Sequence, residues 1–115
     1  MTNGPAAALN RRLLAMSERA ESLVELSVDA LLTKDAGKAE AVIDADRELD
    51  MMEVELEAAA LELLALQQPM ARDLRFIVST IKVTSDLERV GDHAVNIAQA
   101  AQRLIAQHTA FTPDP

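Results

Sequence analysis

Apolar residues recur every three or four positions along most of the chain, which is the spacing of an amphipathic α-helix. Three stretches follow this pattern, at about residues 6–32, 38–67 and 69–107. The apolar positions of the first stretch are Leu9, Leu13, Met16, Ala20, Leu23, Leu26 and Ala30. Those of the second are Val42, Leu49, Leu56, Ala60, Leu63 and Leu66. In the third stretch one stripe mixes apolar and polar residues, namely Leu74, Val78, Ile81, Ser85, Glu88, Asp92 and Val95.

Short breaks separate the three stretches. Residues 34–37 (Lys-Asp-Ala-Gly) interrupt the first pattern, and Thr33 or Asp35 could cap the helix that follows. Pro69 suits the first turn of the third helix, where its missing N–H costs nothing. Three long helices joined by short turns predict an all-α, antiparallel up-down-up bundle. Such a layer would leave a broad apolar flank, so we expect two copies to pair into a six-helix dimer.

Composition narrows the class of protein. The 115 residues suffice for one domain, and a hydrophobic fraction of 50% can supply its core. The absence of cysteine excludes disulfides, thiolate metal sites and cysteine nucleophiles. A net charge of −8 disfavours nucleic-acid binding and contact with an anionic bilayer. No signal peptide or membrane-length apolar run is recognisable, so we expect a cytoplasmic protein without membrane insertion.

Acidic residues form two rows on neighbouring predicted helices. The rows are Asp46, Asp50, Glu53 and Glu57 in the second helix and Glu88 and Asp92 in the third. Carboxylates three or four residues apart share a helix face and repel one another, and only Arg47 and Arg89 lie within helical reach of them. A solvated face normally mixes charges of both signs. Clustered carboxylates are relieved by a bound cation, and the alternative is that the rows are simply solvated surface.

Oxygen donors favour hard or borderline ions. We therefore predict a site for one or more divalent or trivalent ions, such as iron, zinc, manganese or magnesium. Glu88 and Asp92 would chelate or bridge the metal, and the second helix would contribute its ligands from the opposite side, namely Asp46, Asp50 and Glu53.

Other candidate chemistry is weaker. A ferritin-like di-metal centre requires Glu-x-x-His pairs, and the chain has none. His93 points about 100° away from Asp92 around the helix, so we expect a surface or interhelical histidine. Gly91 costs about 1 kcal/mol relative to alanine inside a helix; it either admits a close neighbour or is a neutral packing residue. No phosphate-binding glycine loop, nucleophile elbow or catalytic triad is present, and we expect no enzyme.

Two linked motifs resemble those of the PhoU family of bacterial phosphate-signalling regulators. The first is QQP-x-A-x-DLR at residues 67–75, and the second is DLERVGDHA-x-NIA at residues 86–98. The resemblance implies a three-helix PhoU bundle whose Glu/Asp-x-x-x-Asp motifs bind metal ions or multinuclear metal clusters. Glu88 with Asp92, and Asp46 with Asp50, match that motif. The resemblance further implies a non-enzymatic negative regulator of the phosphate regulon, linking the ATPase of a phosphate-specific ABC transporter to a sensor histidine kinase.

The chain departs from the family in one respect. A typical member carries two tandem three-helix repeats, and this sequence has one, so a homodimer would restore the six-helix arrangement. Three other functions stay open at this point: a metal buffer, an accessory regulator of another ion transporter, and a structural helical oligomerisation module.

Overall fold

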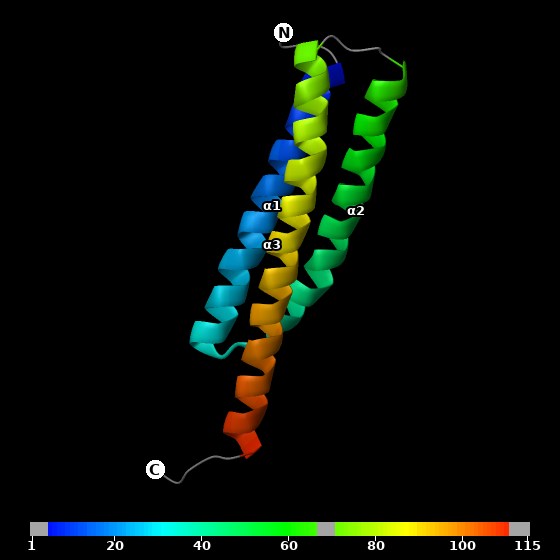
Figure 1. Cartoon of the computed structure of the whole chain (residues 1–115). Helices are drawn as coiled ribbons and strands as arrows, with labels where there is room; N and C mark the ends of the chain where they lie inside the picture. Colours follow the sequence, from blue (N-terminus) through cyan, green and yellow to red (C-terminus); the bar gives the residue numbers. More distant parts are fainter. Residues whose placement is uncertain (1–4, 67–70, 111–115) are drawn as a thin grey trace.

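The chain folds into three long α-helices that lie side by side (Figure 1). A computed structural model describes residues 5–66 and 71–110, which form α1 (Pro5–Thr33), α2 (Ala36–Leu66) and α3 (Ala71–Ala110). Figure 1 shows α2 running antiparallel to α1 and α3, and the end of α3 extending past the α1–α2 turn. This confirms the all-α, up-down-up bundle. Gln67 and Pro69, at the predicted junction, lie outside the described residues.

The bundle is a rod of 68 × 21 × 17 Å in which each helix packs against both others around a narrow core. None of the helices in the described ranges is both long and apolar enough to span a bilayer. The buried residues of each helix follow steps of three and four, the spacing of long helices that pack nearly parallel. They are Leu9, Met16, Ala20, Leu23, Ser27 and Ala30 in α1, Ala39, Val42, Leu49, Leu56 and Ala60 in α2, and Ile77, Thr80, Thr84, Ala94, Ala98 and Ala101 in α3.

The buried stripe of α3 is not the one that the sequence pattern singled out. Leu74 and Val78 from that pattern are 43% and 53% exposed. The core instead receives mostly alanine and threonine, which let α1 and α2 approach closely. Thr80 and Thr84 tolerate burial because each hydroxyl donates to the carbonyl four residues earlier, at 2.9 and 2.7 Å. A stripe of small and polar residues carries little hydrophobic signal, and for that reason the pattern pointed to the neighbouring face.

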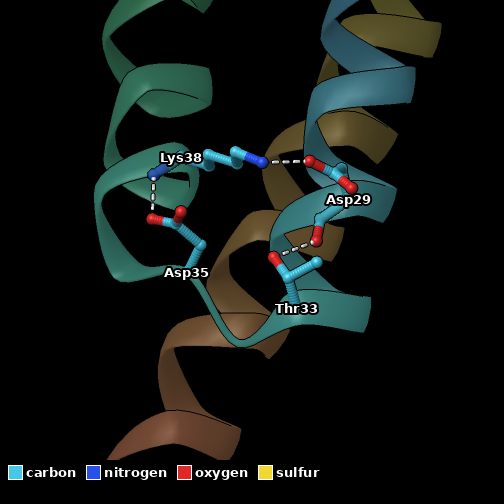
Figure 2. Close-up of polar contacts among 4 residues, drawn as sticks. All are labelled: Asp29, Thr33, Asp35 and Lys38. Atoms are coloured by element: carbon cyan, nitrogen blue, oxygen red, sulfur yellow. Dashed lines mark hydrogen bonds and ion pairs between the residues drawn. The ribbon is translucent and has the colours of Figure 1, made fainter.

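The turn between α1 and α2 needs only two residues, Lys34 and Asp35 (Figure 2). Lys34 has a positive φ of 55°, and the Asp35 N–H donates to the Ala30 carbonyl at 3.0 Å. This is a Schellman ending of α1, in which the left-handed residue is usually glycine. The Asp35 carboxylate then accepts from the Lys38 backbone N–H at 3.0 Å, so Asp35 also caps α2.

Side chains around this turn add two further contacts, both visible in Figure 2. Thr33, the other candidate cap, donates its hydroxyl to the Asp29 carbonyl at 2.7 Å and so stays with its own helix. The Lys38 ammonium pairs with the Asp29 carboxylate across the turn. These contacts join the end of α1 to the start of α2, where the chain reverses direction.

Candidate functional site

Gly91 lies where α2 and α3 approach each other closely. A Cβ atom added at Gly91 would lie 2.4 Å from Leu49 Cδ2 and 2.8 Å from Asp46 Oδ1. Both distances are too short for a real side chain, so the glycine is required by its neighbours on α2. Of the two roles that the sequence left open for Gly91, close approach of a neighbouring helix is the correct one. It brings the Asp46 carboxylate against the backbone of α3.

Asp46 lies among carboxylates from both helices. Burial, together with the negative charges of Asp50, Asp92 and Glu88, raises the pKa of Asp46 to about 6. Burial also raises the pKa of Glu88, with added repulsion from Asp92 and Asp50. The acidic row of α2 is therefore near enough to that of α3 for the two to repel.

Glu53 lies one turn further along α2 in the same cluster. Burial raises its pKa to about 7, and the charges of Glu88, Glu57 and Asp50 contribute. Glu57 belongs to the acidic row of α2 but was not among the predicted ligands, and the structure brings it to Glu88 as well. The five predicted ligands and Glu57 therefore affect one another electrostatically through Asp46, Glu53 and Glu88. We call these six the acidic cluster: Asp46, Asp50, Glu53, Glu57, Glu88 and Asp92.

The acidic cluster lacks a cationic partner within the described ranges. The ion pairs found there join Arg19 to Glu48, Lys38 to Asp29 and Arg89 to Asp86, and none involves a member of the cluster. In addition, Asp46 Oδ1 is buried and has no hydrogen-bond partner. A buried acceptor without a donor costs about 1–3 kcal/mol. The cluster therefore concentrates negative charge, which the nearby charge of Arg89 offsets only in part at Glu88.

The acidic cluster has the ligand type that a hard cation prefers, but its carboxylates are not arranged around a common point. All six donors are carboxylates, the ligands that magnesium, manganese and iron accept. Across residues 5–66 and 71–110, however, no group of three or more His, Asp or Glu side chains is arranged to hold a metal ion. Asp92 is exposed, and Glu53 and Glu88 are half-buried. His93 is exposed, as expected for a surface histidine.

Comparison with known proteins gives a family match. The family model described as the PhoU domain matches residues 13–101. A protein from Clostridium acetobutylicum is 44% identical over 97 residues, which are 84% of this chain and 44% of that protein. One from Aquifex aeolicus is 36% identical over 102 residues, which are 89% of this chain and 46% of that protein. Each is named a phosphate-specific transport system accessory protein PhoU homolog, a name that describes no enzyme.

A solved structure is similar as well. The crystal structure of PhoU from Pseudomonas aeruginosa superposes with a TM-score of 0.88 at 36% sequence identity. The match covers 93% of this chain and 51% of that one. The chain thus spans about half the length of the proteins that it matches.

Proposed function

Since the chain belongs to the PhoU family, we propose that it is a non-enzymatic regulator of phosphate-specific transport. The observation that carries this proposal is the match of the PhoU domain to residues 13–101, with the whole three-helix unit superposing on half of a PhoU structure. In this role the chain is a negative regulator that joins the transporter ATPase to a sensor histidine kinase. It acts through protein contacts in the cytoplasm, where the ATPase and the kinase domain are found.

The acidic cluster is the proposed cation site of this regulator. Glu88 and Asp92 on α3 would hold the ion, with Asp46, Asp50 and Glu53 opposite them on α2. The carboxylates would coordinate the ion, and its positive charge would relieve their mutual repulsion. The ion would also give the buried Asp46 Oδ1 a positive neighbour. The open arrangement favours an ion that keeps several waters, which is the habit of magnesium and manganese.

A second three-helix unit is proposed to pack against this one as a homodimer. The matched relatives are about twice as long, and α1 exposes Leu14, Val28 and Leu32 at 55%, 39% and 77%. A second copy could cover this apolar area.

The regulatory role is tested in the organism that carries the gene. We expect deletion to make phosphatase expression independent of phosphate supply, and the wild-type gene to restore the response. An unchanged phosphate response in the deletion strain would contradict the regulatory proposal and leave a metal buffer or an oligomerisation module.

The cation site is tested by metal content per subunit, on protein purified without chelator or affinity tag. Glu88→Ala with Asp92→Ala is expected to remove the metal while light scattering shows an unchanged mass. The control, Glu21→Ala with Glu25→Ala, removes two exposed carboxylates at the same spacing on α1 and should retain the metal. Wild-type protein that stays metal-free after soaking in Mn²⁺, Fe²⁺, Zn²⁺ and Mg²⁺ would show that the acidic cluster is solvated surface.

A further inference from the structure

Four large apolar side chains on α2 and α3 are exposed beside the acidic cluster. Val54 and Leu61 on α2 are 66% and 58% exposed, and Leu74 and Val78 on α3 are 43% and 53% exposed. They are outside the buried core, and none of the roles proposed above uses them. A set of this kind on a small bundle is typical of an interaction surface.

Helix geometry puts these side chains on the same side of the bundle as the carboxylates. On α3, residues 74, 78, 81, 85, 88 and 92 follow steps of four and three and share one face. On α2, residues 50, 54, 57 and 61 do the same. Because Asp50 and Glu57 repel Glu88 across the helix pair, both faces open onto one side.

The antiparallel register orders this surface along its length. Gly91 meets Asp46 and Leu49, so moving toward the carboxyl end of α2 means moving toward the amino end of α3. Leu61, twelve residues beyond Leu49, is therefore at about the same level along the bundle as Val78, thirteen residues before Gly91. We call the whole surface the α2–α3 face: an apolar half with Leu61, Leu74 and Val78, and an acidic half with Glu53, Glu88 and Asp92.

Charge decides what can cover the α2–α3 face. Two copies of this face would each present the carboxylates of Glu53, Glu88 and Asp92, so the two faces would repel each other. Anionic lipid and nucleic acid are repelled for the same reason. A partner that presents Lys or Arg beside apolar residues fits both halves, because its cations meet carboxylates that have no ion pair within the described ranges.

We propose that the α2–α3 face binds a basic amphipathic helix of a partner protein. Two packed helices offer a shallow groove in which a third helix can lie about 8–10 Å away. Residues 46 to 61 of α2 span about 22 Å, which matches a partner helix of about 15 residues. Its binding stripe carries Leu, Ile or Val in one half and Lys or Arg in the other. This inference rests on the proposed function, since it names the kind of partner through which the regulator acts.

The test uses a labelled synthetic helix of about 18 residues with leucine in one half of its stripe and lysine in the other. Binding to the full chain is followed by fluorescence anisotropy in buffer containing chelator, so neither metal binding nor phosphate signalling enters the result. Leu61→Ser with Val78→Ser should weaken binding about 30-fold. The matched control is Val83→Ser with Leu104→Ser on α3, also one exposed leucine and one exposed valine but outside the α2–α3 face, and it should bind like wild type.

Charge is tested separately. Glu57→Gln with Glu88→Gln should weaken binding about tenfold and flatten its dependence on salt, whereas Glu21→Gln with Glu25→Gln on α1 should do neither. The proposal is overturned if both members of a matched pair have equal effects, or if a peptide with alanine in place of leucine binds as tightly. It is also overturned if the wild type is a dimer that Leu61→Ser with Val78→Ser converts to a monomer, because a second copy would then occupy the face.

Discussion

Replacing Glu53 by glutamine should stabilise the protein at alkaline pH and leave it unchanged at acid pH. Glu53 is half-buried in the acidic cluster, and burial with the charges of Glu88, Glu57 and Asp50 raises its pKa from 4.5 to about 7. Burial with neighbouring charges likewise raises the pKa of Asp46 from 3.8 to about 6. A carboxyl whose pKa is higher in the folded state holds its proton there over a pH range in which the unfolded chain has already lost it.

The sign of the effect follows from this difference. Between about pH 4 and pH 7 the folded state binds more protons, so the free energy of unfolding falls as pH rises. Each pKa rise corresponds to about 3 kcal/mol for a fully buried group. Both groups are only partly buried, and solvent screening reduces the cost to about 1 kcal/mol each. The wild type should therefore lose about 2 kcal/mol of stability between pH 4 and pH 8, of which Glu53→Gln restores about 1 kcal/mol.

Urea unfolding followed by circular dichroism measures this directly, in chelator and at several pH values. A gain of 1 kcal/mol moves the midpoint by about 0.5–1 M urea. Glu55→Gln is the control, because Glu55 is an exposed carboxylate two residues away on the same helix. A wild type that is more stable at pH 8 than at pH 4 would refute the reasoning, as would an equal gain from Glu55→Gln.

Three further substitutions probe the packing and the turn. Gly91→Ala should destabilise the folded protein by about 1 kcal/mol in thermal melts. The added methyl group would crowd buried Leu49 at a cost of about 1–3 kcal/mol, which outweighs a gain in helix propensity of about 1 kcal/mol. A stabilised variant would contradict the close approach of the two helices. Lys34→Gly should stabilise the folded protein by about 0.5–1 kcal/mol, since glycine adopts a φ of 55° without strain. A lower melting temperature in this variant would argue against the Schellman ending of α1. Asp35→Ala should lower the free energy of unfolding by about 1 kcal/mol, because it removes the acceptor for the Lys38 N–H. Asp35→Asn should keep most of the capping energy. Equal losses in the two variants would show that charge, and not the hydrogen bond, is responsible.

The three helices and their order follow from the sequence because the signals are local. Apolar spacing of three and four predicts helices wherever it is sustained, and a short polar break between two such stretches leaves only an antiparallel return. Asp35 was recognisable as a possible cap, because an aspartate just before a helical stretch can accept a hydrogen bond from a backbone N–H of the first turn. The two acidic rows were equally visible, because spacing of three and four places carboxylates on one helix face.

Which face of α3 is buried depended on the tertiary structure. In α3 the core stripe runs through Ile77, Thr84 and Ala94, whereas the larger Leu74 and Val78 remain exposed. Side-chain size alone favoured the wrong stripe. Burial depends instead on how closely α1 and α2 approach, and small residues permit the closest approach.

The sequence by itself therefore determined the secondary structure and the presence of two acidic rows, since both arise from residues within one or two helical turns of each other. Only the tertiary structure decided that Gly91 admits Asp46, that the two rows repel each other, and that exposed apolar residues adjoin them. Those features depend on the antiparallel register of α2 against α3. Register is set by the fit of side chains far apart in the chain, and no local pattern specifies it.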